Sequence, residues 1–416
     1  MKVYLETYGC TANKADSNII IGILKENKHK IVESMDQADL LILNTCTVID
    51  TTEQRMLSRL REYKKTKKPI IVAGCMATIQ QNTINSITPK ARFLPPQHVN
   101  NIIDVIKNNK AQFTEENKTQ LPKHYNDINA PIQIAEGCMQ NCSYCITRLA
   151  RGKLNSYPIN EIKQDIKNAL KQDCKEIYLT AQDTASYGLD VKTNLGELIT
   201  AINEIKEDFR VRIGMMNPYT LQKNLQPILS AYNHQKIYKF LHIPVQSGDN
   251  HILQKMNRKY TIEEFKEIIK KFKTKYPNIT ISTDIIVGFP SETEKQFQNT
   301  IDLLKQTKPD IINITRYSAR PYTKAKTMKN RIPTDIAKQR STKLTKICKQ
   351  ISVENNKKHI NKTYNILITE QTKNNISKGR TENYKPTVIK NNLQIGTFHQ
   401  VKITNATNTH LVGNLI

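Results

Sequence analysis

Three cysteines that lie within eight residues of one another are the feature that most constrains this chain. Cys138, Cys142 and Cys145 follow a C-x3-C-x2-C spacing. Three thiolates can ligate three irons of a cubane cluster, whereas an ordinary [4Fe-4S] carrier supplies four cysteines. The spacing therefore predicts a [4Fe-4S] cluster with one iron open to a small molecule. A structural zinc site would need a fourth Cys or His close by, and no His lies between Cys138 and Cys145.

Three further cysteines recur in the first hundred residues, and each follows a short apolar segment. The pairs are residues 3–7 with Cys10, residues 40–44 with Cys46, and residues 70–73 with Cys75. Helix-like segments lie between them, and separations near 30 residues match the repeat of a βαβ unit. The carboxyl ends of parallel strands meet at one edge of a sheet, where α/β proteins gather ligands. We therefore predict a second [4Fe-4S] cluster on this trio, also with one open iron.

From residue 131 onward, strand-like and helix-like segments alternate again. The strand candidates are residues 132–135, 176–180, 210–213, 240–243, 280–287 and 311–315. Six βα repeats predict an open, partial barrel of the TIM type, (β/α)6, over residues 131–333. A polar stretch at 111–130 is the expected linker from an N-terminal parallel-sheet α/β domain at 1–110. The clustered cysteines then fall after the first barrel strand, at the end of the barrel where active sites form.

The last part of the chain changes character. Residues 334–360 are rich in Lys and predict a helical connector. Short strands at 365–369, 386–390, 396–404 and 411–415, separated by turn residues, predict a small antiparallel β-barrel over residues 361–416. The chain as a whole is expected to belong to the α/β class.

The charge distribution favours a polyanionic partner. The chain has 63 basic and 37 acidic residues, a net charge of +26, and 19 of the basic but only 4 of the acidic residues lie between Arg320 and Ile416. A general bias toward Lys, Asn and Ile would explain the total but not this concentration, so nucleic acid is the expected partner. No apolar run approaches the roughly 20 residues of a membrane span, and the N-terminus leaves no room for a signal peptide. We expect a cytoplasmic protein without a membrane segment.

Motifs along nearly the whole chain resemble those of the radical-SAM methylthiotransferases. In the first domain these are Tyr8-Gly9-Cys10, Asn44-Thr45-Cys46 and Gly74-Cys75-Met76. In the barrel they are the segments 137–145, 242–248 and 283–290, and the C-terminal barrel resembles a TRAM domain, an RNA-binding module. The segment from Arg148 to Pro158 resembles the archaeal and eukaryotic branch of the family, which acts on N6-threonylcarbamoyladenosine.

The resemblance implies an activity and its cofactors. Cys138, Cys142 and Cys145 would hold the cluster that binds and cleaves S-adenosylmethionine, and Cys10, Cys46 and Cys75 would hold the cluster that carries the sulfur. The expected reaction adds a methylthio group to C2 of N6-threonylcarbamoyladenosine beside the anticodon of tRNA. The expected partners are tRNA and an electron-donor protein, while the sulfur source stays open. No protein side chain is predicted to be catalytic, because the two clusters carry the chemistry.

Polar residues at predicted strand ends are candidates for contacts with S-adenosylmethionine or the base. They are Thr180, Gln182, Asp183, His242, Gln246 and Asp284, and Tyr144 in the cysteine loop is a further candidate. For Tyr144 the expected role is to pack against the adenine of S-adenosylmethionine. For every one of these residues, ordinary packing or capping is the competing interpretation. One departure concerns Tyr322, which stands where the family usually has Gly, a residue that often serves a positive φ angle.

Two other functions remain open from sequence. The same chemistry could act on a side chain of a ribosomal protein, as in a sister family, and only the branch-like segment from Ala150 to Pro158 separates the two targets. A non-catalytic iron-sulfur RNA-binding protein is the third interpretation, and the open-iron cysteine spacing opposes it.

Overall fold

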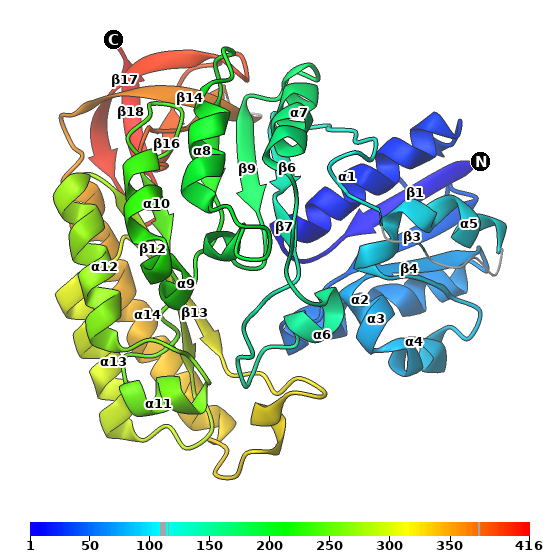
Figure 1. Cartoon of the computed structure of the whole chain (residues 1–416), viewed down its shortest axis with the longest axis horizontal. Coiled ribbons are helices and arrows are strands. Elements are labelled where there is room, and N and C mark those ends of the chain that lie inside the picture. The colour runs from blue at the N-terminus through cyan, green and yellow to red at the C-terminus, as the bar shows by residue number, and fades with distance from the viewer. Residues whose placement is uncertain (109–113, 115, 373–374) are drawn as a thin grey trace. The chain divides into compact units, whose positions relative to one another are not determined.

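The N-terminal sheet has parallel strands in the order β2-β1-β3-β4-β5 (Figure 1). Its strands are β1 (Lys2–Thr7), β2 (Lys30–Ile31), β3 (Leu40–Thr45), β4 (Ile70–Gly74) and β5 (Arg92–Leu94). The helices are α1 (Thr11–Glu26), α2 (Asp50–Lys65), α3 (Cys75–Ile79), α4 (Gln81–Ile87), η1 (Pro96–Asn101) and α5 (Ile102–Lys107). Alternate residues of β3 enter different cores: Leu40 and Ile42 pack with α1 and α5, while Leu41 and Leu43 pack with α2 and α4. A sheet covered on both faces needs such continuously apolar strands, and the predicted α/β domain is confirmed.

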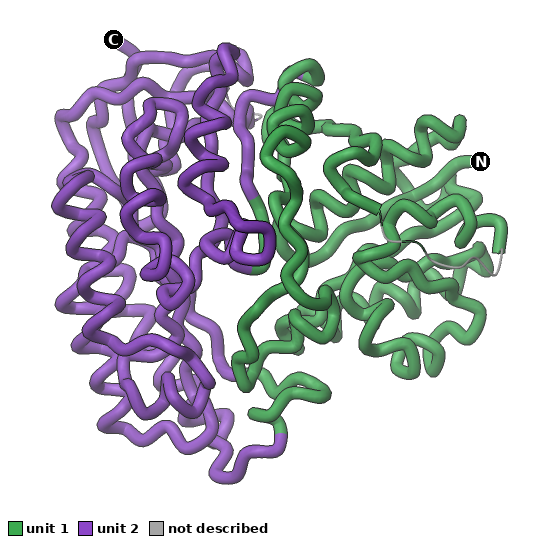
Figure 2. The backbone as a smooth tube through the Cα atoms, viewed as in Figure 1, with its two compact units in different colours: residues 1–172, 180–182, 318–326 green, residues 173–179, 183–317, 327–416 purple. Residues whose placement is uncertain are grey.

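The computed structural model describes residues 1–416 except 109–113, 115 and 373–374. The chain divides into two compact units (Figure 2). The first unit contains residues 1–172, 180–182 and 318–326, and the second contains residues 173–179, 183–317 and 327–416. Of the predicted linker at 111–130, residues 111–113 and 115 lie outside the described part of the chain.

Beyond its sheet, the first unit holds the segment that carries Cys138, Cys142 and Cys145. Its further elements are β6 (Asn129–Gln133), β7 (Ala135–Glu136), α6 (Thr147–Arg151), β8 (Asn155–Ser156) and α7 (Ile159–Leu170). The short strands β7 and β8 pair antiparallel, with Ala135 opposite Ser156. The cysteine loop therefore starts and ends on one ribbon, because β7 precedes it and β8 follows α6.

The second unit contains most of the barrel. Its strands are β9 (Glu176–Thr180), whose last residue belongs to the first unit, β10 (Arg210–Ile213), β11 (Phe240–His242), β12 (Thr280–Val287) and β13 (Ile311–Arg316). Strand β9 pairs parallel with β10, and β12 pairs parallel with both β11 and β13. The helices are η2 (Thr184–Ser186), α8 (Leu195–Asn203), α9 (Pro218–Lys223), α10 (Leu225–Ala231), α11 (Asn250–Lys255), α12 (Ile262–Lys275), α13 (Glu294–Thr307) and η3 (Lys324–Thr327), of which η3 begins in the first unit. With β6, strands occur at every predicted barrel position.

The C-terminal part follows the prediction with two differences. Helix α14 (Thr334–Lys357) leads to a closed barrel of strands β14 (Thr363–Thr372), β15 (Ile376–Arg380), β16 (Pro386–Ile389), β17 (Phe398–Ala406) and β18 (Leu411–Leu415). The sequence prediction missed β15 because Ile376-Ser377-Lys378-Gly379-Arg380 lacks apolar alternation. It also expected antiparallel pairing throughout, whereas β16 and β18 pair parallel. No helix in the described part of the chain is long and apolar enough to cross a membrane.

Within the second unit, a turn of the C-terminal barrel packs against the amino-terminal end of the larger barrel. The Tyr384 ring lies 4.8 Å from the rings of both Tyr238 and Phe240. Its hydroxyl donates to the Tyr178 hydroxyl at 3.0 Å, which donates to buried Glu176 at 2.8 Å. These partners lie at or near the starts of β9 and β11, so the small barrel docks at the end opposite the carboxyl ends of the strands.

Tyr384 should therefore hold the C-terminal barrel in place. We expect Tyr384→Ala to lower the free energy of unfolding by about 3–5 kcal/mol, as for removal of other buried aromatic rings, and to make residues 357–363 sensitive to protease. Tyr384→Phe keeps the ring and loses one hydrogen bond, so it should cost about 1 kcal/mol. Urea unfolding and limited proteolysis measure both effects, and equal stability of the Ala and Phe variants would contradict the docking role.

Candidate functional site

Cys10, Cys46 and Cys75 lie at the carboxyl ends of three neighbouring strands. Cys10 caps the amino end of α1 just after β1, Cys46 follows β3, and Cys75 opens α3 directly after β4. The loop before Cys10 runs against Cys46: a Cβ on Gly9, whose φ is +108°, would lie 2.7 Å from the Cβ of Cys46. Glycine is required there, because any side chain would push the first two cysteines apart.

The three thiols share one electrostatic environment. Burial is the main cause that raises the pKa of Cys75 to about 12; Arg151 acts to lower this pKa, and the nearby Cys10 and Cys46 act to raise it. Burial likewise raises the pKa of Cys46, against which the backbone N–H groups of Val48 and Thr47 donate to its sulfur. Ionised thiolates at this site therefore need a cation to balance them.

This environment fits an iron-sulfur cluster. Metal ligation deprotonates thiols and supplies the missing positive charge, and backbone donors to a ligand sulfur are usual around such clusters. Across the described residues, no three His, Cys, Asp or Glu side chains gather in a way that could hold a metal ion. In a cubane, each thiolate takes a different iron, so ligands from three separate strand ends need not converge on one point.

Cys138, Cys142 and Cys145 lie on one loop whose backbone is tightly folded. A Cβ on Gly137, at φ +77°, would lie 1.8 Å from the Lys153 carbonyl oxygen, so only glycine allows this approach. The Gln140 N–H donates to the Cys138 sulfur at 3.3 Å. The three thiols are partly exposed. Three partly exposed thiols, one of which accepts a backbone hydrogen bond, fit a cluster that binds a second molecule.

A buried charge network, the Arg151 network, ties the two cysteine regions together. Arg151 donates to Asp16 at 2.7 Å and to Glu136 at 2.8 Å, and Lys118 contacts the same two carboxylates at 2.7 and 2.9 Å. All four side chains are buried. Asp16 lies on α1 after Cys10, and Glu136 lies two residues before Cys138. The two cations and two anions balance, which makes their joint burial tolerable.

Asn13 extends the Arg151 network to the first trio. Its Oδ1 accepts from Arg151 at 3.0 Å and lies 3.5 Å from the Cys10 sulfur. Its Nδ2 donates to the Thr45 carbonyl at 2.7 Å, next to Cys46. Burial opposes the charge of Arg151, but Asp16, the Cys75 thiolate and Glu136 hold its pKa well above the usual range. A permanent cation therefore stands beside the first trio.

A second link joins the two cysteine loops. Arg320 is buried and pairs with Glu53, and it also donates to the Thr47 hydroxyl at 3.4 Å, one residue after Cys46. Five residues later, the Ala325 N–H donates to the carbonyl of Ser143 at 2.8 Å. Ser143 lies between Cys142 and Cys145, so the segment 320–325 touches both cysteine loops.

Three of the predicted contact residues meet within the second unit. His242 Nε2 lies 3.0 Å from Asp284, which also accepts from Asn313 at 2.7 Å. Burial would raise the pKa of Asp284, but the bonds from His242 and Asn313 outweigh it and the pKa is lowered. Gln246 has φ +70° and exchanges backbone hydrogen bonds with Asp284 and Ile286 at 2.8 and 2.9 Å. A non-glycine residue at positive φ is strained, and here the two backbone hydrogen bonds to β12 hold it in place.

Other predicted contact residues are distributed differently. Tyr144, Thr180 and Gln182 belong to the first unit, with both cysteine trios. The Gln182 Oε1 is buried and has no hydrogen-bond partner among the described residues, so it could accept from a ligand. Asp183 accepts from the Asn217 N–H at 3.0 Å and from the Thr220 hydroxyl at 2.7 Å. Burial raises the pKa of Asp183 to about 6, and these local bonds suit a structural role.

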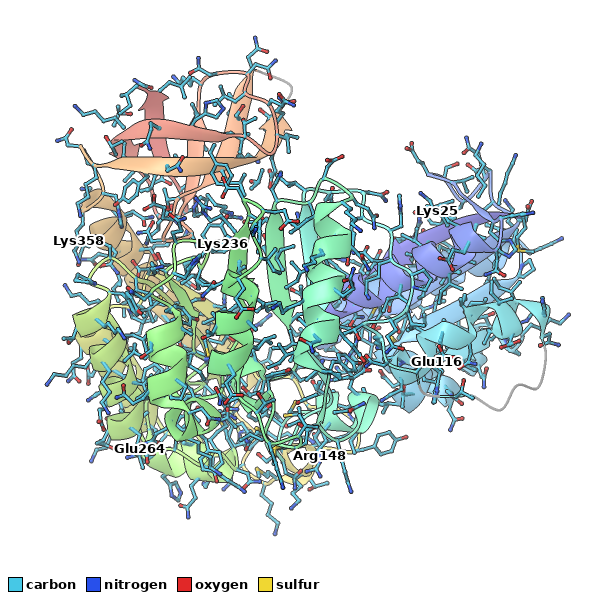
Figure 3. The ribbon with its side chains drawn as sticks, turned by 45° about the horizontal axis from the view of Figure 1, so that its top comes forward. Lys25, Glu116, Arg148, Lys236, Glu264 and Lys358 are labelled. Atoms are coloured by element: carbon cyan, nitrogen blue, oxygen red, sulfur yellow. The ribbon has the colours of Figure 1, made fainter. Side chains whose placement is uncertain are left out.

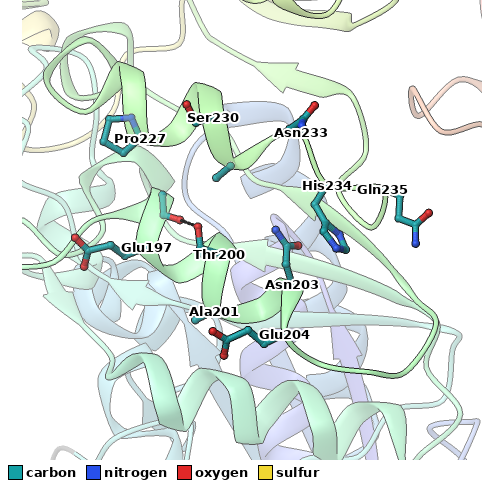
Figure 4. Close-up of a pocket in the computed structure, with 12 residues that line it drawn as sticks. Glu197, Thr200, Ala201, Asn203, Glu204, Pro227, Ser230, Asn233, His234 and Gln235 are labelled. Carbon is teal, nitrogen blue, oxygen red and sulfur yellow. Dashed lines mark hydrogen bonds between the residues drawn. The ribbon is translucent and has the colours of Figure 1, made fainter.

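The second unit also contains a large cavity. It has a volume of about 880 Å³ between α8 and α10, and its lining includes Glu197, Thr200 and His234 (Figure 4). Thr200 donates to the Gly196 carbonyl within α8 at 2.9 Å. None of the predicted site residues lines this cavity.

The sequence prediction did not single out the Arg151 network. Arg151 and Asp16 stand in recognisable motifs, but a charged residue in a sequence carries no sign of burial. Lys118 was assigned to a polar linker, whereas it is buried against two carboxylates. Only the pairing of distant segments reveals why these charges occur.

Family models cover most of the chain. Residues 2–94 match a family described as Uncharacterized protein family UPF0004, residues 132–304 match the Radical SAM superfamily, and residues 357–416 match the TRAM domain. The second and third matches correspond to the barrel and to the C-terminal barrel.

Curated relatives match over the full length. The chain is 40% identical to a probable threonylcarbamoyladenosine tRNA methylthiotransferase from Pyrococcus horikoshii, covering 100% of both chains. It is also 40% identical to one from Methanocaldococcus jannaschii, covering 100% of this chain and 97% of that one. A human threonylcarbamoyladenosine tRNA methylthiotransferase is 33% identical over 89% of this chain and 66% of the human one.

Solved structures support the fold. The radical S-adenosylmethionine methyltransferase TsrM from Kitasatospora setae, with cobalamin and a [4Fe-4S] cluster bound, matches with a TM-score of 0.60 at 10% identity. The match covers 78% of this chain and 76% of TsrM.

Arg151 should be the most sensitive position of the network. Arg151→Ala leaves Asp16 and Glu136 buried without their main cation, and such a loss costs about 3–5 kcal/mol. The matched control is Arg148→Ala on the same helix, since Arg148 (Figure 3) is half-buried and makes no ion pair with the described residues. Anaerobic urea unfolding measures both, and similar stabilities for the two variants would contradict the network's role.

Proposed function

The chain belongs to the threonylcarbamoyladenosine tRNA methylthiotransferase family, and we propose that it adds a methylthio group to C2 of N6-threonylcarbamoyladenosine in tRNA. The observation that carries the proposal is the presence of two cysteine trios in one compact unit, tied by the Arg151 network. A cluster carrier without an enzymatic role would have no use for two three-cysteine sites side by side in this way.

We assign the cysteines as cluster ligands on this basis. Cys138, Cys142 and Cys145 would hold one [4Fe-4S] cluster, and Cys10, Cys46 and Cys75 the other. When bound, the clusters would supply the one-electron cleavage of S-adenosylmethionine and the sulfur for transfer. The protein's own task is to fix both sites at one separation, which the Arg151 network and the segment 320–325 support.

Polar side chains on barrel strands or in the loops after them are proposed to orient S-adenosylmethionine or the base. Asp284 lies within β12 and not at its end, where the sequence had predicted it. His242 and Asp284 form a hydrogen-bonded pair, and the strained Gln246 lies beside them. Gln182 offers a buried acceptor. Tyr144 and Thr180 stay candidates for the same ligands, and Asp183 is better explained as a support for α9 through Asn217 and Thr220.

The remaining partners are also proposals. An electron-donor protein would reduce the clusters, and the site of action would be the cytoplasm, where tRNA is modified. We keep the domain boundaries predicted from sequence, 1–110, 111–130, 131–333, 334–360 and 361–416, as working divisions.

We propose that exposed lysines of the C-terminal part bind the phosphates of tRNA. Not all of the basic excess is available for this purpose: Arg320, Arg340 and Lys385 are buried against carboxylates. Helix α14 still exposes Lys338, Lys346 and Lys349, and the C-terminal barrel exposes Lys362, Lys390 and Lys402. Lys358, at the end of α14, lies next to that barrel (Figure 3).

The two trios should divide the chemistry. Replacing Cys138, Cys142 and Cys145 together by Ala should halve the iron of the anaerobically reconstituted protein and abolish cleavage of S-adenosylmethionine. Replacing Cys46 should abolish the methylthio product on tRNA while some 5′-deoxyadenosine still forms, because the site that cleaves S-adenosylmethionine is intact.

A buried cysteine outside both trios provides the control. Cys348 lies inside α14, so Cys348→Ala should keep the iron content, the cleavage and the product. Unchanged iron in the triple variant would contradict the ligand assignment. Loss of both activities in a folded Cys46→Ala protein would contradict separate roles.

Salt dependence tests the proposed binding of tRNA phosphates by these lysines. Each phosphate contact releases counterions, so tRNA affinity should fall steeply with salt, and each lost contact should lower the slope by about 0.9. The triple change of Lys338, Lys346 and Lys349 to Gln, or of Lys362, Lys390 and Lys402 to Gln, should flatten the slope. The same change at exposed Lys28, Lys64 and Lys67 of the N-terminal domain removes equal charge and should alter it less. If tRNA affinity depended equally on salt in all three variants, another surface would have to bind the tRNA phosphates.

A further inference from the structure

Tyr322 is a large aromatic residue whose side chain is exposed to solvent. It is 74% exposed, and its φ is +61°. A residue with a Cβ is strained in this left-handed conformation, which persists only where surrounding contacts impose it. An exposed tyrosine in such a conformation contributes nothing to a core, so folding alone does not account for it.

The loop around Tyr322 is fixed at both ends. Before it, Arg320 is buried against Glu53 and the Ser318 hydroxyl accepts from the Asp50 N–H at 3.2 Å. After it, the Thr323 hydroxyl donates to the Arg320 carbonyl at 2.8 Å, and the Ala325 N–H donates to the Ser143 carbonyl at 2.8 Å. These contacts over-determine the backbone and explain how a strained residue persists.

Both ends of the loop touch cysteine regions. Arg320 reaches Thr47, the neighbour of Cys46, and Ala325 reaches the loop between Cys142 and Cys145. The five peptide units from Arg320 to Ala325 span at most about 18 Å when extended. Tyr322 therefore lies within a few residues of both proposed cluster sites, whichever way the loop curves.

Other apolar side chains are exposed on the same loops. Val48 is 48% exposed two residues after Cys46, and Met139 is 52% exposed beside Cys138. Each of these side chains lies within two residues of a proposed cluster ligand, so a partner that approaches the cysteine sites would meet apolar surface there. A flat ring on the loop that touches both cysteine regions suits a flat, apolar-faced partner.

We propose that Tyr322 is a stacking platform for an unpaired base of the RNA substrate. The inference rests on the proposed function, which brings an anticodon loop to the cysteine sites. Proteins recognise single-stranded loops by stacking splayed bases on aromatic rings. The platform fixes the loop so that the target base reaches the two sites, which makes Tyr322 a specificity-determining residue.

Tyr322→Gly distinguishes a role in RNA binding from a role in folding, because the substitution should weaken RNA affinity without lowering thermal stability. Loss of the ring should weaken affinity for a synthetic anticodon stem-loop that contains N6-threonylcarbamoyladenosine by about 5- to 100-fold, the range for one lost base stack. The melting temperature should not fall, because glycine relieves the positive φ. Asn361→Gly is the backbone control, since Asn361 is exposed at φ +69° and carries no ring. It should leave RNA affinity unchanged.

A fluorescence measurement tests stacking directly. The chain has no tryptophan, so Tyr322→Trp introduces a single reporter at the proposed contact. The stem-loop should quench its emission and bind as tightly as to the unaltered protein. A fully paired RNA duplex of equal charge should bind without quenching, because its bases are not free to stack.

The outcomes separate this inference from the proposed function. If the unaltered protein binds the stem-loop and Tyr322→Gly binds it equally well, the platform is wrong while the proposed function stands. If the unaltered protein does not bind the stem-loop, or binds a ribosomal protein instead, the proposed function fails with it. A lower melting temperature for Tyr322→Gly would show that the ring supports the fold and would overturn the platform.

Discussion

The pairing of Arg151 with Asp16 and Glu136 is the interaction on which the rest of the site depends. It joins the helix after Cys10 to the strand before Cys138, and it does so with fully buried charges. A buried ion pair adds little net stability, but its geometry is strict because a misplaced charge is costly. The network therefore specifies one arrangement of the two cysteine regions rather than strengthening the fold in general. The segment 320–325 supports the same arrangement, because Arg320 contacts Glu53 and Thr47 near Cys46 and Ala325 contacts Ser143 in the second cysteine loop.

Elements with strong periodic patterns could be predicted from the sequence, and elements defined by distant pairing could not. The strands before Cys10, Cys46 and Cys75 were predictable because each is an apolar run followed by a breaker. Strand β15 escaped prediction because Ser377 and Gly379 interrupt its pattern, and its place depends on β14 and β16. The burial of Lys118 and Arg151 could not be predicted, since one of their two shared partners, Asp16, lies more than a hundred residues away in the sequence.

The same limit applies to the basic C-terminal part. Its composition correctly indicated a concentration of positive charge, but composition does not distinguish a lysine in solvent from one in an ion pair. Lys385 neutralises Asp310 at 2.7 Å within the docking turn of Tyr384, and Arg340 neutralises Glu292 at 2.8 Å. Part of the excess thus fastens the C-terminal barrel and α14 to the larger barrel, and the exposed remainder is left to meet phosphates.

The central conclusion is that this chain converts N6-threonylcarbamoyladenosine in tRNA to its 2-methylthio derivative. Nucleoside mass spectrometry of tRNA from cells with and without the protein measures this directly. The account predicts that the 2-methylthio nucleoside disappears without the protein and that unmodified N6-threonylcarbamoyladenosine accumulates in equal amount. An unchanged nucleoside profile would contradict the account, and a loss of methylthio groups from ribosomal protein alone would transfer the chemistry to another substrate.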